Sequence, residues 1–176
     1  MIAGATKKGI CFFVWHDRGG VERILNRVEK RYNKVLEQGS SEHLQKLQNE
    51  LSKYFDGTLT EFRVPIDVNG TKFENKVWGK LLKIPYGETR SYGEIASELG
   101  NPGASRAVGR ANGSNYLSIV IPCHRVIESN GKLRGYGGGL MRKKFLLDLE
   151  SSAVPEQIEF NFYLGKLNNS QISISV

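Results

Sequence analysis

Few side chains in this sequence could carry nucleophilic or metal chemistry. The 176 residues include two cysteines, Cys11 and Cys123, and three histidines, His16, His43 and His124. No pair has the Cys-x-x-Cys or His-x-x-x-His spacing of a zinc site, so we expect no bound metal. Cys11 lies inside the apolar run 10–15 and is expected to be a small buried side chain. His16 and His43 stand alone in the sequence and are expected at the surface.

Cys123 has a different setting. It follows an apolar segment, 118–122, and is followed directly by His124 and Arg125. A thiolate is the reactive form of cysteine, and nearby cations or an imidazole increase its population. Adjacency in the sequence does not by itself place the imidazole against the sulfur, but the pattern favours a reactive thiol over a structural one.

The positive charge of the chain is concentrated around this cysteine. Residues 76–150 hold 12 Lys and Arg against 6 Asp and Glu, a net of +6, whereas the whole chain carries +7. A basic block inside a folded segment suits a polyanion such as nucleic acid. A charge that serves only solubility explains the same numbers equally well.

The elements that must position these residues are readable from caps and periodicity. Capping boxes at Thr71–Glu74 and Ser91–Glu94 predict helices from about 72 to 82 and from 91 to 99. A turn at 100–103 and a second small-residue helix at 104–112 complete a helix-turn-helix outline, on which Arg106 and Arg110 share a face. Many helical hairpins share this outline and bind nothing. Residues 118–122 are expected to form a buried strand, and 141–150 an amphipathic helix.

The first third of the chain predicts a separate α/β unit. We expect a buried strand at 10–15, a helix over 44–55 and an edge strand at 62–67, where Pro65 cannot donate to a ladder. The predicted domains are therefore an α/β domain at 1–70 and a second domain at 71–150. The tail 151–176 has no assigned role, although its alternating end, 171–176, could form a strand.

Composition excludes some classes of protein. No stretch approaches the roughly 20 apolar residues of a membrane span. The start of the chain lacks the pattern of a secretory signal. Two cysteines cannot build a disulfide framework, so reduced thiols in the cytoplasm are expected.

The segments around Cys123 resemble the O6-alkylguanine-DNA alkyltransferases, also called methylated-DNA–protein-cysteine methyltransferases. The matching segments in chain order are Ile84-Pro-Tyr-Gly-Glu-Thr-Arg-Ser-Tyr-Gly-Glu-Ile-Ala96, Arg106-Ala-Val-Gly109, Asn115, Pro122-Cys-His-Arg-Val126, Gly135-Tyr-Gly-Gly138 and Leu146-Leu-Asp-Leu-Glu150. A fixed tetrapeptide such as Pro-Cys-His-Arg occurs by chance in roughly one chain in a thousand of this length. Residues 4–68 resemble, more loosely, the N-terminal domain of the bacterial Ada-type members.

The resemblance implies a two-part fold. The N-terminal α/β domain is expected to be ribonuclease-H-like; because Met1 enters where a preceding strand is expected, it is either abridged or part of a longer chain. The C-terminal domain is expected to be mostly α, with a winged-helix-like helix-turn-helix. One departure from the family is Tyr116, where many members have proline after the residue equivalent to Asn115.

For catalysis, the resemblance implies that Cys123 accepts an alkyl group from O6 of a damaged guanine. His124 would act as base through an ordered water, and Glu150 would hold the imidazole ring. Tyr92 would donate a hydrogen bond or proton to the guanine as negative charge builds, and Asn115 would brace the turn before the nucleophile. From the sequence alone, without the resemblance, Glu150 is better interpreted as a helix-end carboxylate and Tyr92 as a core ring.

For binding, the resemblance implies that the guanine is extruded from the duplex. Arg106 would fill the hole in the base stack, while small residues of its helix would allow a close approach to the minor groove. The DNA-binding residues are expected to be Ala104, Arg106, Ala107, Gly109, Arg110 and Arg125. The pocket residues are expected to be Pro122, Val126, Tyr136, Gly137 and Gly138, with the Cys123 and Val126 carbonyls reading the guanine amino group. Arg142, Lys143 and Lys144 would face either phosphates or solvent.

The expected activity is thus a stoichiometric, irreversible transfer to Cys123 that needs no cofactor. The expected partner is double-stranded DNA containing O6-alkylguanine, bound by a monomer in the cytoplasm, at the nucleoid. Two alternatives remain: a sensor that binds alkylated DNA without transfer, and the repair half of a transcriptional regulator. Sensors of this family lack the cysteine, which Cys123 supplies here.

Overall fold

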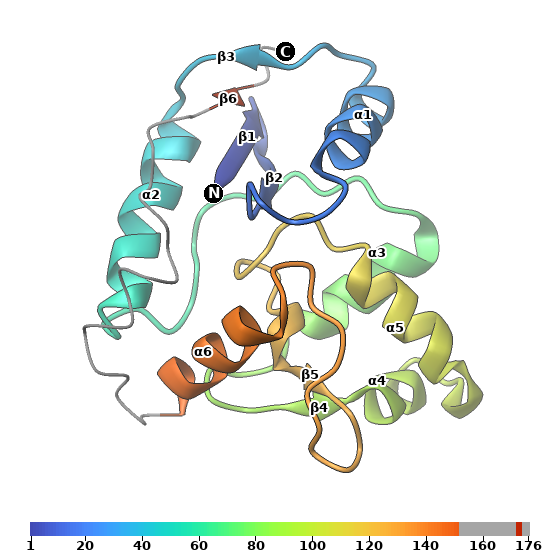
Figure 1. Ribbon diagram of the computed structural model, residues 1–176. Coiled ribbons are helices and arrows are strands. Elements are labelled where there is room, and N and C mark those ends of the chain that lie inside the picture. The colour runs from blue at the N-terminus through green and yellow to red at the C-terminus, as the bar shows by residue number, and fades with distance from the viewer. Residues whose placement is uncertain (152–171, 174–176) are drawn as a thin grey trace. The chain divides into compact units, whose positions relative to one another are not determined.

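A computed structural model of the chain describes residues 1–151 and 172–173 (Figure 1). The described residues divide into two compact units, one formed by Met1–Asn69 with strand β6, the other running from Gly70 to the end of helix α6. Most of the tail for which no role was predicted, 152–171 and 174–176, lies outside the described residues.

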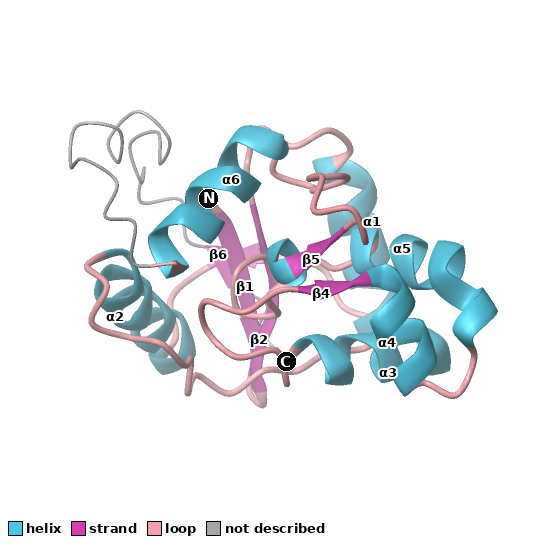
Figure 2. Ribbon diagram, turned by 90° about the horizontal axis from the view of Figure 1, so that it is seen from below, coloured by secondary structure: helices cyan, strands magenta, loops and turns pink. Residues whose placement is uncertain are grey.

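An antiparallel hairpin forms the centre of the first unit. Strand β1 (Ile2–Thr6) pairs with β2 (Gly9–Val14), and the register shifts between Gly4 and Ala5. The two strands lie side by side in Figure 2. Every residue of β2 is buried, which explains its unbroken apolar sequence and confirms the predicted strand. A side chain at Gly4 would place its Cβ 2.1 Å from the Phe12 ring, so this position requires glycine.

Two helices and a short strand pair complete the first unit. Helix α1 (Val21–Tyr32) precedes β3 (Glu37–Gln38), which pairs antiparallel with β6 (Ile172–Ser173). Helix α2 (Glu42–Phe55) confirms the predicted helix, and its N-cap Ser41 accepts a hydrogen bond from the Leu44 amide. The apolar positions that predicted this helix, including Leu44 and Leu51, are buried.

The predicted edge strand at 62–67 is reduced to one bridge. Ile10 pairs in parallel with Ile66 alone, through bonds from the Ile10 amide to the Pro65 carbonyl (2.8 Å) and from the Asp67 amide to the Ile10 carbonyl (2.9 Å). Proline has no N–H to extend the ladder, so Pro65 limits the pairing.

Helices dominate the second unit. They are α3 (Lys72–Leu81), α4 (Tyr92–Glu98), the 3₁₀ turn η1 (Pro102–Ala104), α5 (Ser105–Gly113) and α6 (Leu140–Glu150). Both predicted capping boxes are present, with reciprocal bonds at Thr71–Glu74 and Ser91–Glu94. The predicted pair of helices around a short turn is therefore α4, η1 and α5. Trp78 of α3 fastens α5 through a 2.9 Å bond from its indole N–H to the Ala111 carbonyl.

The segment before Cys123 is not the strand that its apolar sequence predicted. It folds as tight turns, with the Val120 amide bonded to the Ser118 carbonyl (2.8 Å) and the Ile121 amide to the Leu117 carbonyl (2.9 Å). Ile119 has φ 69°, a left-handed conformation that is strained for a β-branched residue. The chain then forms a 3₁₀ turn, η2 (Cys123–Arg125), and strand β5 (Val126–Ile127), which pairs in parallel with β4 (Arg90–Ser91).

Among residues 1–151 and 172–173, no helix has the length and apolar character needed to cross a membrane.

Candidate active site

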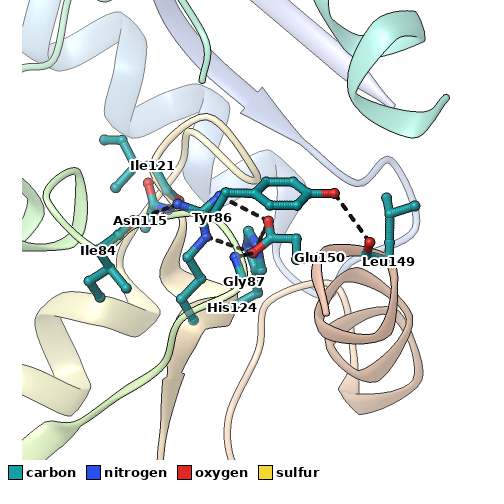
Figure 3. Close-up of polar contacts among 9 residues, drawn as sticks. Ile84, Tyr86, Gly87, Asn115, Ile121, His124, Leu149 and Glu150 are labelled. Carbon is teal, nitrogen blue, oxygen red and sulfur yellow. Dashed lines mark hydrogen bonds and ion pairs between the residues drawn. The ribbon is translucent and has the colours of Figure 1, made fainter. Parts of the chain in front are cut away.

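Cys123 lies at the first position of η2, with a residue exposure of only 5%. Asn115 holds the turns that lead to it. Its amide nitrogen donates to the Ile121 carbonyl (2.9 Å; Figure 3). The same nitrogen donates to the Leu117 carbonyl (3.4 Å), and the side-chain oxygen accepts from the Leu117 amide (2.8 Å). One buried side chain thus satisfies three backbone groups that a strand would have paired with a neighbour. These bonds explain how the apolar segment folds as turns.

His124 and Glu150 form a buried pair. The His124 Nε2 lies 2.8 Å from Glu150 Oε1, and the exposures of the two residues are 0% and 3%. Figure 3 shows the carboxylate, which comes from the C-terminal end of α6, facing the imidazole. Burial lowers the pKa of His124, despite the opposing effect of Glu150, so the ring is neutral at pH 7.

This contact sets the tautomer of the imidazole. Glu150 is ionised, because burial opposes its charge but hydrogen bonds from His124 and Arg125 outweigh that effect and lower its pKa from 4.5 to about 2. A carboxylate only accepts, so Nε2 must carry the His124 proton. Nδ1 then keeps a lone pair, and this buried atom has no hydrogen-bond partner among the described residues. A neutral imidazole with a held N–H and an unengaged lone pair is able to act as a general base.

Arg125 lies inside the protein rather than at its surface. Its Nε and Nη2 donate to the two oxygens of Glu150 (2.7 and 2.9 Å), and its Nη1 donates to the Ile84 carbonyl (2.6 Å). The guanidinium also lies 5.8 Å from the centre of the Tyr86 ring. The prediction that Arg125 contacts DNA is therefore wrong for this structure, because its charge neutralises a buried carboxylate.

The loop between α3 and β4 closes around the same carboxylate. Tyr86 donates its hydroxyl to the Leu149 carbonyl (3.2 Å), and the Gly87 amide lies 3.5 Å from Glu150 Oε2 (Figure 3). Gly87 has φ 77°, and a Cβ there would lie 2.8 Å from the Glu150 carbonyl oxygen. This close approach needs glycine on both counts.

Lys143 is the second buried cation of the unit. It has 0% exposure, and its Nζ donates to the carbonyls of Val126 (2.5 Å) and Arg134 (2.8 Å). Burial lowers its pKa from 10.5 to about 8, while the charges of Cys123 and Glu128 oppose the shift. Lys143 faces neither phosphates nor solvent, so both predicted roles are wrong for it. It ties the loop before α6 to strand β5, and a negative charge at Cys123 would favour its protonated form.

Tyr92 lies at the start of α4 and is half-buried. Its hydroxyl donates to the Arg134 carbonyl (3.2 Å), the same oxygen that Lys143 contacts. Burial raises the pKa of Tyr92, and the charges of Glu128 and Cys123 raise it further, so the hydroxyl keeps its proton. Tyr92 is thus a hydrogen-bond donor linked to Lys143 through one carbonyl.

The remaining predicted residues fall into two groups. Pro122 and Val126 are buried beside the thiol, whereas Tyr136, Gly137 and Gly138 lie partly exposed on the loop before α6. The Val126 carbonyl accepts from Lys143 (2.5 Å) and the Cys123 carbonyl lies 3.4 Å from the Asn112 amide nitrogen, so both predicted guanine-reading oxygens have protein partners. On α5 and its preceding turn, Arg106 and Arg110 are exposed, and Ala104, Ala107 and Gly109 are partly exposed between them.

Sequence reasoning missed Tyr86, Asn112 and the inward orientation of Arg125 and Lys143. Tyr86 and Arg125 lie within the segments that carried the family resemblance, but no local periodicity marks them. The signal that could have found Arg125 is the charge of Glu150, which needs a partner if it is buried.

Comparison with known proteins identifies relatives of both units. The family described as "6-O-methylguanine DNA methyltransferase, DNA binding domain" matches residues 72–152. The methylated-DNA–protein-cysteine methyltransferase of Mycobacterium bovis is 59% identical over 110 residues, which span 62% of this chain and 67% of the relative. The inducible enzyme of the same name from Bacillus subtilis is 41% identical over 152 residues, covering 86% of this chain and 84% of its own.

Solved structures agree with these matches. The crystal structure of Mycobacterium tuberculosis OGT in complex with DNA has a TM-score of 0.63 at 53% identity and covers 71% of this chain and 82% of that chain. The O6-methylguanine-DNA methyltransferase of Pyrococcus kodakaraensis has a TM-score of 0.58 at 26% identity, covering 82% of this chain and 87% of that chain.

Proposed function

Because the chain belongs to the methylated-DNA–protein-cysteine methyltransferase family, we propose that it repairs DNA by transferring an alkyl group from O6 of guanine to Cys123. The observation that carries this proposal is the imidazole of His124, the residue that follows Cys123: Glu150 holds its Nε2–H, and its Nδ1 has no partner among the described residues. The substrate is double-stranded DNA that contains O6-alkylguanine.

The reaction follows from these groups. His124 Nδ1 takes the Cys123 thiol proton through a bridging water, and the sulfur attacks the alkyl carbon. The new C–S bond forms as the C–O6 bond breaks, and the electron pair remains on the guanine, where Tyr92 donates to the developing charge. A thioether is a poor leaving group and the chain places no second thiol to remove the alkyl group, so each molecule acts once and no cofactor is needed.

Recognition uses the α4–α5 pair as a helix-turn-helix. Arg106 fills the gap left by the extruded guanine, Arg110 binds phosphate, and the small residues Ala104, Ala107 and Gly109 let α5 approach the minor groove. The pocket wall is formed by Pro122, Val126, Tyr136, Gly137 and Gly138. Asn115 acts indirectly, by holding the turn that carries the nucleophile.

The finer description of the fold belongs to the same proposal. We assign residues 1–70 to a ribonuclease-H-like α/β domain and 71–150 to a domain with a winged-helix-like helix-turn-helix. The protein acts as a monomer on DNA in the cytoplasm. Transfer is favoured over the sensor because Cys123 supplies the acceptor thiol that such sensors lack.

Intact mass after incubation with duplex DNA containing O6-methylguanine tests the proposal. We expect the gain of one methyl group on Cys123 and no gain in Cys123→Ser. Cys11→Ser is the matched control and should still react, since burial raises the pKa of Cys11 to about 12 and keeps that thiol protonated. An unchanged mass with tight binding to the lesion would instead identify a sensor.

A further inference from the structure

The first unit carries a basic face that the proposed chemistry does not use. Residues 21–34 contain five cations, Arg23, Arg27, Lys30, Arg31 and Lys34, against two carboxylates, although residues 1–75 are nearly balanced at 12 Lys and Arg to 10 Asp and Glu. Four of these cations, Arg23, Arg27, Lys30 and Arg31, lie within α1 (Val21–Tyr32), and Lys34 follows its end. Helical spacing puts Arg23, Arg27 and Lys30 on one side of α1 with Asn26, because positions three, four and seven apart share a face. An open hollow on α1 is lined by Arg23, Asn26, Arg27, Lys30 and Arg31.

Three cations of this face, Arg23, Arg27 and Lys30, are not neutralised within the described part of the chain. Arg23, Arg27 and Lys30 are exposed and make no hydrogen bond or ion pair with any described residue. The Glu29 carboxylate forms no ion pair with these three cations; its Oε1 accepts a hydrogen bond from the Leu36 amide (3.0 Å). Like charges four residues apart, such as Arg23 and Arg27, repel one another and weaken a helix. An arrangement that is unfavourable in the free protein indicates an anionic partner.

We propose that the α1 face (Arg23, Asn26, Arg27, Lys30) is a second DNA-binding surface that contacts backbone phosphates without reading sequence. Arg23 and Lys30 are seven residues apart, which is about 10 Å along a helix axis, or the rise of about three base pairs on one strand. Arg27 lies between them, and the Asn26 amide supplies an uncharged donor of the kind that also binds phosphate oxygens. This inference rests on the proposed function, because it takes the same DNA as the partner.

The salt dependence of DNA binding gives a quantitative test. Each neutralised phosphate contributes about 0.9 to the slope of log K against log salt concentration. The triple variant Arg23→Gln, Arg27→Gln, Lys30→Gln should therefore lower the slope by up to about 2.7. Between 50 and 200 mM salt the wild-type protein should lose up to about 40-fold more affinity than the variant. Methyl transfer to Cys123 at saturating DNA should be unchanged.

A matched variant controls for the change in net charge. Lys7→Gln, Lys8→Gln, Lys53→Gln removes three exposed cations of the same unit that lie off the α1 face, and we expect it to keep the wild-type slope. Thermal melting of both variants checks that they fold, which glutamine, a good helix former, should allow.

The possible results separate the two proposals. Failure of wild-type protein to methylate Cys123 would overturn the proposed function. Normal transfer with equal slopes for wild type and the α1 variant, or an equal drop in the control, would overturn the α1 surface alone. A short duplex that admits one protein should be used. The α1 variant could instead keep the wild-type salt slope on the short duplex and lose cooperative binding only on long DNA. The α1 face would then bind a second copy of the chain, and this result would also contradict a phosphate contact.

Discussion

Replacing Glu150 by glutamine tests the buried charge network most directly. The carboxylate accepts from His124 and twice from Arg125. An amide is uncharged, so Glu150→Gln leaves the Arg125 charge unpaired. An amide also has a nitrogen that donates in place of one accepting oxygen, so this nitrogen would face an N–H group of His124 or Arg125. Breaking one side of a buried ion pair costs about 3–5 kcal/mol.

The pKa of Glu150 gives an independent magnitude. It is lowered from 4.5 to about 2 in the folded protein, which at about 1.4 kcal/mol per pKa unit corresponds to about 3 kcal/mol. A carboxyl with a depressed pKa stabilises the fold above pH 4.5, and this contribution is lost as pH falls from 4.5 towards 2. At pH 3 the difference in unfolding free energy between wild type and Glu150→Gln should fall to about half or less of its value at pH 6.

Urea unfolding, followed by tryptophan fluorescence, measures the difference in unfolding free energy between wild type and Glu150→Gln at pH 6 and at pH 3. The chain has two tryptophans, Trp15 in the first unit and Trp78 in the second. In a Trp15→Phe background Trp78 is therefore the single fluorescent tryptophan, and it reports the unit that holds Glu150. Asp148→Asn is the matched control on the same helix: it pairs with the exposed Lys144 and should change stability by less than about 0.5 kcal/mol.

Two outcomes would refute this reasoning. A loss below about 1 kcal/mol at pH 6 would mean that the buried pair is not stabilised as the geometry requires. A loss of equal size at pH 3 and pH 6 would mean that the charge of Glu150 is not its source. The variant should also slow methyl transfer by about a hundredfold or more, because the His124 tautomer is no longer held.

Three further predictions concern neighbouring residues. Asn115→Ala removes three buried hydrogen bonds and should destabilise the protein by about 2–4 kcal/mol in urea unfolding; a wild-type midpoint would contradict its bracing role. Lys143 has a folded pKa of about 8 against 10.5 unfolded, so wild-type stability relative to Lys143→Met should rise by about 2 kcal/mol between pH 8 and pH 10, measured by circular dichroism in urea. Because Gly138 leaves the proposed pocket wall open, O6-benzylguanine should add a benzyl group to Cys123 in intact mass, and an unmodified thiol in protein that still reacts with methylated DNA would disprove an open wall.

Local chemistry made much of the second unit predictable. The capping boxes at Thr71 and Ser91 depend on residues three apart, and both appear where the sequence places them. The apolar segment before Cys123 was predicted wrongly, because a short continuous apolar run suits a buried strand equally well. Its turns depend on the Asn115 side chain, which reaches the Ile121 carbonyl six residues away (2.9 Å). A pattern of apolar residues does not show that a side chain, rather than a neighbouring strand, makes the hydrogen bonds to the backbone.

The direction of a cation was harder to predict than its presence. Arg125 is two residues after Cys123, and Lys143 lies between Arg142 and Lys144. From the sequence, each of these cations could therefore be predicted to contact DNA. Their inward orientation depends on partners 25 residues or 9 and 17 residues away in the chain. Long-range charge compensation of this kind is fixed by the tertiary fold rather than by composition.

This burial changes how the basic block acts. Residues 76–150 carry +6, but Arg125, Lys143 and Glu150 are buried and account for +1 of it. Arg125 keeps the site electrically balanced: with Glu150 ionised, moving the Cys123 proton to His124 creates one positive and one negative charge and leaves the net charge of the four groups at zero. Without that arginine the same step would take place beside an uncompensated carboxylate, which opposes formation of the thiolate. In the proposed reaction Arg125 therefore supports the thiolate, and the proposed attraction for DNA rests on exposed cations such as Arg106 and Arg110.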